Sequence, residues 1–480
     1  MVFSSPIFLF LFLPLFLSSY LLVPRSVRNS ILLAASLIFY AWGELYYLLV
    51  MLASIGLNHL VGLLLDRSAT PRARKVILAL GITSNLILFT SFKYVDFMVD
   101  NLNILLGAIG WQTIGHPELH LPIGISFFTF QAMSYIVDVY RKKSPVQEQL
   151  KNTALYISLF PQLIAGPIVR YPQIAGQLLN RTISVENFAL GVRRFTIGLA
   201  KKVLIANTLA LPADNIFALM PGPIGADLAW LAITCYTFQI YFDFSGYSDM
   251  AIGLGKMLGF DIPENFDYPY FSKSVREFWR RWHISLSTWF RDYVYIPLGG
   301  SRTTALWTHR NLLVVFFLCG LWHGASWNFV AWGLFHGLFL VLERGWLGSL
   351  LRRLPAPLCR VYTLGVIVMA WVFFRAENMT SALVFFRSLL FMDQEGADAL
   401  PFWDYANVEI VAVLLLALAG STPLLPLIKR QLGKEGSPFF QPVIRRLLPG
   451  GAAFGLVVIL VLCCMSLAGG THNPFIYFRF

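Results

Sequence analysis

The run PIFLFLFLPLFLSSYLLV at residues 6–23 decides the class of fold, because its eighteen residues carry no charge. An apolar helix of about 20 residues is long enough to cross the roughly 30 Å hydrocarbon core of a bilayer. No basic stretch precedes the run and no small-residue cleavage site follows it. We therefore expect a retained first span and no signal peptide.

Apolar runs of similar length recur through the rest of the chain. By the same length rule we expect about eleven spans, near residues 6–23, 29–47, 47–65, 75–92, 122–140, 153–169, 226–244, 325–343, 361–375, 408–427 and 449–469. Shorter apolar pieces near 186–212, 249–260 and 311–322 are interpreted as partial or tilted helices. Gly and Pro interrupt several runs, and such breaks are tolerated at membrane depth only where protein or a cavity surrounds them. The sequence therefore predicts an all-α, polytopic transmembrane helical bundle with an interior, plus re-entrant or interfacial helices, in a single domain over residues 1–480.

The composition excludes a soluble domain. Apolar residues make up 57% of the chain and charged residues only 13%, and the mean hydropathy is +0.65. Soluble proteins carry about 25% charged residues. The net charge of +12 does not indicate nucleic-acid binding, because the Lys and Arg residues lie in short clusters between apolar runs. Such clusters mark cytoplasmic loops, and their alternation predicts that both termini lie outside the cytoplasm.

The segment 272–300 has a different pattern. Its aromatic residues, among them Phe278, Trp282 and Trp289, recur at helical spacing, and arginines fall between them. A helix with aromatic residues on one face and arginines on the other is typical of the membrane interface. The sequence therefore predicts an interfacial helix here.

His323 is the strongest candidate for a reactive group. It joins two apolar runs in LCGLWHGA (318–325), where glycines on both sides permit close approach of backbone or substrate. An imidazole has an unperturbed pKa of about 6.5 and can act as a general base at neutral pH. The alternative is a histidine that is hydrogen-bonded between helices, and the residues alone leave both roles open.

Two further histidines are weaker candidates. His283, in WRRWHIS (279–285), lies at the edge of the apolar face of the expected interfacial helix, where an amphipathic ring needs no chemistry. His336, in LFHG (334–337), is interpreted as helix packing.

Asp243 and Asp249 lie near the end of a long apolar run, where carboxylates must find partners or water. We expect structural pairing for both, with the arginines of 276–291 as partners, in preference to direct catalysis. The chain has no G-x-S-x-G elbow, P-loop or HExxH motif, and its histidines lack the spacing of metal ligands. We therefore expect neither a covalent serine mechanism nor a metal site.

Five stretches carry a recognisable pattern: PIGISFFTFQAMSYIVDVYR (122–141), LFPQLIAGPIVR (159–170), FDFSGYSDMAIGLGKMLGF (242–260), EFWRRWHISLSTWFRDYVYIPLGG (277–300) and GLWHGASWNFVAWGLFHG (320–337). Together they resemble the membrane-bound O-acyltransferase family, in particular its bacterial alginate O-acetylation branch. The resemblance spans nearly the whole chain. It implies an enzyme that transfers an acyl group from a thioester to a hydroxyl, through a central tunnel that reaches a buried histidine.

The resemblance also implies roles for particular residues. His323, in Trp-His-Gly, matches the essential histidine of the family, which would act as general base. His283, in Arg-Trp-His, matches a second polar position that is asparagine or histidine in various members, and would orient the donor or stabilise the oxyanion. Arg276, Arg280 and Arg281 lie where the phosphates of acetyl-CoA could dock from the cytoplasm. Anchoring of this helix to anionic lipid is the alternative role for these arginines.

For the bacterial branch the resemblance implies a multi-pass protein of the inner membrane. It would pass acetyl from cytoplasmic acetyl-CoA to a periplasmic or membrane-tethered O-acetyltransferase, so that the polysaccharide acceptor is reached indirectly. Alginate is the expected polymer, with cellulose and peptidoglycan as alternatives. We expect no permanently bound cofactor and no nucleic-acid partner. A transporter or channel, or a scaffold of a secretion complex without covalent chemistry, is the competing interpretation.

Overall fold

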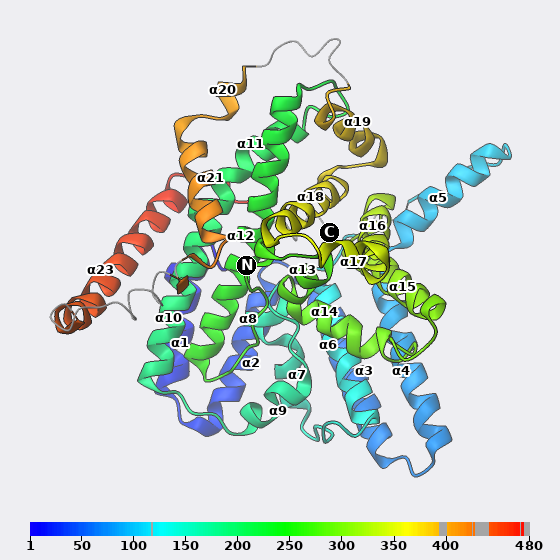
Figure 1. Ribbon diagram of the computed structural model, residues 1–480. Coiled ribbons are helices and arrows are strands. Elements are labelled where there is room, and N and C mark those ends of the chain that lie inside the picture. Colours follow the sequence, from blue (N-terminus) through cyan, green and yellow to red (C-terminus); the bar gives the residue numbers. More distant parts are fainter. Residues whose placement is uncertain (117–118, 393–400, 425, 428–440, 471, 475–480) are drawn as a thin grey trace. The chain divides into compact units, whose positions relative to one another are not determined.

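The computed structural model describes residues 1–116, 119–392, 401–424, 426–427, 441–470 and 472–474 (Figure 1). Every regular element in these ranges is a helix, as predicted. Six helices are long and apolar enough to cross a membrane: Tyr47–Arg67, Pro71–Lys93, Val185–Phe217, Ala305–His323, Ala356–Arg375 and Gly450–Ala468. Three apolar helices are shorter: Phe8–Leu22, Met379–Leu389 and Val408–Gly420. An all-helical chain with several apolar helices is thus confirmed, while the total of about eleven spans stays a prediction.

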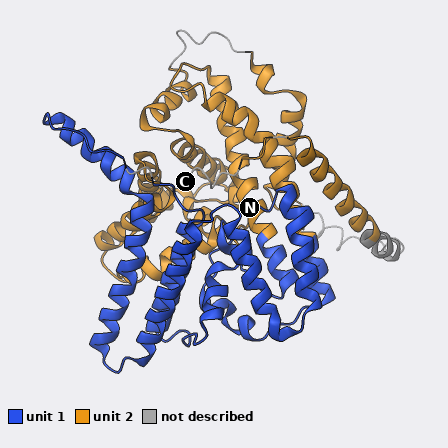
Figure 2. Cartoon of the chain, turned by 180° about the vertical axis from the view of Figure 1, so that it is seen from behind, with its two compact units in different colours: residues 1–192, 251–263 blue, residues 193–250, 264–480 orange. Residues whose placement is uncertain are grey.

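The helices gather in two compact units (Figure 2). Unit 1 comprises residues 1–192 and 251–263, and unit 2 comprises residues 193–250 and 264–480. Two boundaries fall inside the helices α10 (Val185–Ala200) and α12 (Ala226–Leu258), and the third lies in the loop after α12. A single domain over residues 1–480 stays a prediction, because compactness does not show that either unit folds by itself.

Unit 1 begins with the π-helical turn η1 (Phe8–Phe12) and the helices α1 (Leu13–Leu22) and α2 (Arg25–Ala41). The apolar helices α3 (Tyr47–Arg67) and α4 (Pro71–Lys93) pack against α6 (Ile125–Tyr140), and α5 (Val95–Ala108) projects from the end of α4 (Figure 1). The helices α7 (Leu150–Ser158), α8 (Phe160–Leu163) and α9 (Tyr171–Leu179) follow. Phenylalanine rings form part of the core, where Phe160 meets Phe12 and Phe16 at centroid distances of 5.6 and 5.2 Å.

Unit 2 contains the continuation of α10 through η2 (Lys201–Ala206) into α11 (Asn207–Phe217). After α12 come four short elements: η3 (Pro269–Phe271), α13 (Val275–Arg281), α14 (Ile284–Phe290) and η4 (Arg291–Tyr295). They are followed by α15 (Ala305–His323), α16 (Trp327–Arg344), α17 (Trp346–Leu351), α18 (Ala356–Arg375) and α19 (Met379–Leu389). The described part ends with α20 (Phe402–Tyr405), α21 (Val408–Gly420) and α23 (Gln441–Ala468).

Glycines allow α15 and α16 to pack backbone to backbone. A Cβ atom on Gly320 would lie 2.3 Å from the carbonyl oxygen of Phe329, and one on Gly333 would lie 2.2 Å from that of Phe316. A backbone oxygen cannot yield unless the two helices separate, so only glycine fits at these positions. The close approach that the sequence predicts beside the WHG motif is therefore made by the backbone of α16.

Several expected elements differ from the structure. The piece near 249–260 is not a separate partial helix, because it is the end of α12 (Ala226–Leu258), which also contains the expected span 226–244. The run 153–169 is not one span, because α7 ends at Ser158 and α8 begins at Phe160 with a proline in its first turn. The pieces near 186–212 and 311–322 are not partial helices, because they belong to Val185–Phe217 and Ala305–His323, both long enough to span. Cations inside the first of these helices, such as Arg194 and Lys201, make it look too polar in the sequence.

A further difference concerns the interfacial helix expected over 272–300. The segment is broken into α13, α14 and η4, and its first break falls at His283. The aromatic side chains Phe278, Trp282 and Trp289 are buried in the protein, so their helical spacing reflects packing within unit 2.

Candidate active site

His323 is the last residue of α15 and lies among aromatic rings. It is 5% exposed. Its ring meets those of Trp332 in α16 and Phe374 in α18 edge-on, at centroid distances of 4.9 and 5.1 Å. Apolar rings on these sides keep bulk water from the imidazole, and a low local dielectric strengthens every electrostatic interaction that it makes.

His283 occupies the break between α13 and α14 and is fully buried. Its backbone is left-handed, with φ of 42° and ψ of 54°. A non-glycine residue adopts this conformation only at a cost, so the surrounding structure must hold it in place. The chain changes direction at His283, so α13 does not continue into α14.

Asn265, in the loop after α12, fixes the ring of His283. Its Oδ1 accepts hydrogen bonds from the backbone N–H and the hydroxyl of Ser285, at 3.1 and 2.9 Å. The backbone donor identifies this atom as the carbonyl oxygen, and it lies 3.3 Å from Nδ1 of His283. Because a carbonyl oxygen can only accept, the network assigns the imidazole proton to Nδ1.

The opposite nitrogen of His283 is then an unprotonated acceptor. Burial lowers the pKa of His283 to about 3, so the ring is neutral at pH 7. Its Nε2 is buried and has no hydrogen-bond partner among the residues that the structure describes. A buried acceptor without a partner costs free energy, and a substrate donor would satisfy it.

Trp322 connects the two candidate histidines. Its ring centroid lies 6.1 Å from that of His283 and 4.9 Å from that of His323. The structure thus brings these two residues, forty positions apart in the sequence, to the same indole. The third histidine, His336, is fully buried and accepts a hydrogen bond from the indole N–H of Trp279 at 3.4 Å, which agrees with the packing role expected for it.

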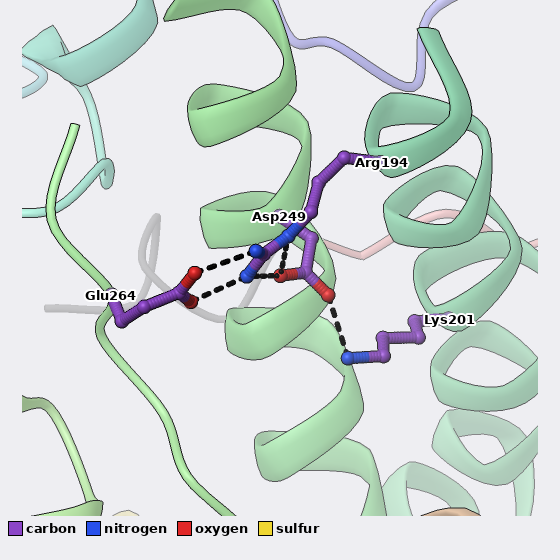
Figure 3. Close-up of polar contacts among 4 residues, drawn as sticks. All are labelled: Arg194, Lys201, Asp249 and Glu264. Atoms are coloured by element: carbon purple, nitrogen blue, oxygen red, sulfur yellow. Dashed lines mark hydrogen bonds and ion pairs between the residues drawn. The ribbon is translucent and has the colours of Figure 1, made fainter. Parts of the chain in front are cut away.

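An ion-pair cluster anchors the loop that carries Asn265 (Figure 3). The guanidinium of Arg194 donates to both oxygens of Glu264, at 2.6 and 2.5 Å, and twice to Oδ1 of Asp249, at 2.9 and 2.7 Å. Lys201 donates to Oδ2 of Asp249 at 2.6 Å. A bidentate arginine–carboxylate pair fixes direction as well as distance. Since Glu264 directly precedes Asn265, the cluster holds the loop next to the residue that positions the histidine.

The arginines predicted as partners of Asp249 are wrong, although the ion pairing expected for Asp243 and Asp249 is confirmed. Asp249 pairs with cations of α10 and η2, and Asp243 lies 2.7 Å from Nζ of Lys202 in η2. The arginines of 276–291 are not the partners of Asp249. The reason is the close crossing of α10 and α12, where a Cβ on Gly198 would lie 2.6 Å from the carbonyl oxygen of Gly246.

A cavity of about 510 Å³ lies among α13, α14, α15 and α16. Four arginines line it: Arg276, Arg280, Arg291 and Arg344. The described lining includes no carboxylate. Arg291 is already paired with Asp292, at 2.7 and 3.1 Å, so Arg276, Arg280 and Arg344 are the guanidinium groups that favour a phosphate or carboxylate ligand.

The rest of this cavity is largely apolar, and neither His283 nor His323 lines it. Trp279 and Phe316 line it, together with Cys319, which lies one helical turn before His323. Arg281 is not part of the lining, because its guanidinium pairs with Glu277 and Asp267. Of the three arginines proposed from the sequence, the structure thus places Arg276 and Arg280 together at the cavity and Arg281 elsewhere.

Two positioning residues escape sequence reasoning. Glu343 of α16 is buried, and its carboxylate accepts hydrogen bonds from the backbone N–H groups of Val275 and Arg276, at 2.6 and 3.0 Å, at the start of α13. A carboxylate there satisfies N–H groups that have no partner within the helix. A glutamate at the end of an apolar run is the signal that could have found Glu343. For Asn265 there is no such signal, because its role depends on the path of a loop.

Comparison with known proteins assigns the chain to a family. Residues 115–386 match the membrane-bound O-acyltransferase family, MBOAT, and this range contains His283 and His323. The chain belongs to this family, and it is therefore a membrane protein and an acyltransferase.

Three relatives are similar over most of their length. The chain is 48% identical to the probable alginate O-acetylase AlgI of Pseudomonas aeruginosa, over 80% of this chain and 73% of that protein. It is 40% identical to the protein of the same description from Pseudomonas putida, over the full length of both. The peptidoglycan O-acetyltransferase of Helicobacter pylori is 37% identical, over 80% of this chain and 78% of that protein.

Proposed function

We propose that this acyltransferase takes acetyl from cytoplasmic acetyl-CoA and passes it across the bacterial inner membrane for O-acetylation of an extracytoplasmic polysaccharide, with alginate as the first candidate. The observation that carries the proposal is the meeting of His283 and His323 at Trp322, beside a cavity lined by arginines. The names of the relatives support acetyl as the group and alginate as the polymer.

The chemistry centres on His323. As general base its imidazole takes the proton of an acceptor hydroxyl while that oxygen attacks the thioester carbonyl. The C–S bond then breaks, the thiolate leaves and takes up a proton, and an ester is formed. Such a base contributes about 10²–10⁴-fold to the rate, and the aromatic rings around it supply a dry, fixed geometry.

His283 has an orienting role in this proposal. With its proton on Nδ1 and directed to Asn265, the ring has no N–H left for an oxyanion. Its Nε2 can only accept, so it suits an amide N–H of the donor arm or the attacking hydroxyl. We therefore assign substrate orientation, rather than oxyanion stabilisation, to His283.

The arginine-lined cavity is the proposed donor site. Phosphates of acetyl-CoA would bind Arg276 and Arg280, with Arg344 completing the cationic wall. The apolar lining near Cys319 would receive the thioester arm. Anionic lipid is the alternative ligand for the same guanidinium groups. If acetyl-CoA is the ligand, loss of these groups raises the KM for acetyl-CoA, and if lipid is the ligand, the KM stays unchanged.

The proposed partner is a periplasmic or membrane-tethered O-acetyltransferase, because the donor and the polymer lie on opposite sides of the membrane. The polymer itself would then be reached indirectly. A central tunnel that joins the histidines to both faces stays part of the proposal.

Acetyl content of the secreted polysaccharide tests the proposal in a deletion strain that carries wild type, His323→Ala or His283→Ala. His309→Ala, in the same helix as His323, is the matched control. We expect acetylation to vanish with His323→Ala and to persist with the control, at equal protein levels in the membrane. Normal acetylation with His323→Ala would instead mean that the protein is a conduit or a scaffold without covalent chemistry.

A further inference from the structure

A second cavity, of about 520 Å³, lies in unit 1, where residues of α2, α9 and the end of α12 meet. None of its lining residues takes part in the proposed reaction. Among the described residues that line it, one is a carboxylate, Asp261, and five are cationic: Arg25, Arg28, Lys151, Arg181 and Lys256. The cavity therefore has a strong excess of positive charge.

Asp261 neutralises little of this charge. Its Oδ1 lies 3.8 Å from Nζ of Lys256, and its side chain is 79% exposed. An exposed ion pair of that length is worth little. Clustered cations repel one another, and this repulsion is relieved when an anion binds.

Two side chains of the wall, Arg181 and Gln177, are held in place by hydrogen bonds. Nε and Nη2 of Arg181 donate to the hydroxyl of Tyr20 at 3.0 and 2.8 Å, and the guanidinium lies 4.5 Å from the ring centroid of Phe260. Gln177 accepts a hydrogen bond from the backbone N–H of Asp261 at 2.9 Å. A guanidinium that is already held loses little further entropy when it binds an anion.

Arg28 supplies an independent indication that the cavity suits an anion. Its guanidinium lies 5.7 Å from the ring centroid of Tyr20, whose hydroxyl is the partner of Arg181. Its Nε is buried and has no hydrogen-bond partner in the part of the chain that the structure describes. A buried N–H of a charged group that lacks an acceptor is costly, and an oxyanion in the cavity would provide one.

We propose that this cavity binds a phosphate-bearing ligand. Phosphate oxygens match the fork of a guanidinium, and an ammonium group such as that of Lys151 adds charge without a directional demand. Two sources carry the group: the headgroup of an anionic phospholipid, and a soluble compound such as coenzyme A. Leu179, which lines the cavity and is 64% exposed, offers an apolar surface next to the cations, as a lipid would require.

The test compares binding to the full-length protein in detergent, with phosphatidylglycerol and coenzyme A as separate probes. Diacylglycerol, which has the acyl chains without the phosphate, is the control ligand. The variant Arg28→Gln/Lys151→Gln removes two cations that make no side-chain hydrogen bond among the described residues. The control variant Arg72→Gln/Lys75→Gln removes the same charge from an exposed part of α4 in the same unit, outside the cavity.

We expect Arg28→Gln/Lys151→Gln to weaken binding of at least one phosphate-bearing probe about ten-fold or more, and the control variant to leave it nearly unchanged. Loss of phosphatidylglycerol binding alone identifies a lipid site, and loss of coenzyme A binding alone identifies a soluble ligand. The proposal is overturned if the two variants change the binding of both probes equally, or if diacylglycerol binds as tightly as the phosphate-bearing probes. Both measurements are independent of acyl transfer.

Discussion

His283 is held in a left-handed backbone conformation, and Nδ1 of its ring lies 3.3 Å from Oδ1 of Asn265 and 3.5 Å from the hydroxyl of Ser285. Removing the oxygen of Asn265 leaves Nδ1 and the backbone N–H of Ser285 without this acceptor in a buried place. The ring can then rotate or change its tautomer, and Nε2 no longer presents a lone pair in a fixed direction. Asn265 is thus a positioning residue for His283.

Substitution of Asn265 separates the positioning role from a merely structural one. We expect Asn265→Ala to lower kcat by about 10²-fold, the cost of a small misplacement near the reacting atoms. Asn265→Asp keeps an oxygen for Ser285 and for the imidazole, so it should retain more activity at neutral or higher pH. The measurement is acetyl transfer by membranes that contain equal amounts of each protein.

The pH profile gives the second readout for Asn265→Asp. A carboxylate beside the ring favours the imidazolium and raises the pKa of His283 above its value of about 3. Protonation then blocks Nε2 at a higher pH, so the acid limb of activity should move to higher pH than in wild type. An unchanged acid limb with reduced activity would mean that Asn265 only supports the loop.

At the scale of elements, the site depends on how short helices are anchored to long ones. The loop after α12 is fixed by the bidentate pair of Arg194 and Glu264 (Figure 3). The helix α13 is fixed at its start by Glu343. We expect Arg194→Gln to speed amide hydrogen exchange in residues 260–270, because the fork that holds Glu264 is lost. Arg193→Gln, at the exposed residue next to Arg194, is the control. Equal rates of amide hydrogen exchange in the two variants would contradict this role of the cluster.

The α15–α16 hairpin offers a second test at this scale. Gly333→Ala places a methyl group against the carbonyl oxygen of Phe316, so the helices must separate, at a cost of about 1–3 kcal/mol. Gly365→Ala in α18 is the matched control, because a Cβ there meets nothing within 4 Å. We expect a lower midpoint of thermal unfolding for Gly333→Ala and little change for Gly365→Ala. Similar midpoints for both would show that the hairpin is not packed this closely.

The sequence predicts an element well where one physical rule determines it. It predicts an element poorly where tertiary contacts determine it. Apolar length predicts α3 and α4, and the WHG motif leads to His323. The same rule fails for Val185–Phe217, because cations within that helix are paired with carboxylates of α12. Helical spacing over 272–300 gives no sign of the break at His283, which Asn265 stabilises from a distant loop.

At the scale of the whole molecule, the proposed relay requires that the donor be bound separately from the place where the acetyl group leaves. Arg276→Gln/Arg280→Gln removes half of the arginines that line the donor cavity. We expect the KM for acetyl-CoA to rise about ten-fold or more with a smaller change in kcat, because the phosphates do not react. Arg281→Gln on the same helix should leave the KM nearly unchanged, since that side chain pairs with Glu277 and Asp267.

The opposite pattern would point to lipid anchoring. If Arg276→Gln/Arg280→Gln leaves the KM unchanged but lowers the amount of protein in the membrane, these arginines hold α13 at the membrane surface and the donor binds elsewhere.

Transfer of labelled acetyl from acetyl-CoA into the lumen of sealed inverted membrane vesicles tests the central claim most directly. The cytoplasmic face is outermost in such vesicles, so the label must cross the membrane to be counted. With the partner transferase present, we predict luminal label for wild type and His309→Ala and none for His323→Ala, although His323→Ala still binds the donor. Luminal label at the wild-type level with His323→Ala would show that acyl transfer is not centred on this histidine.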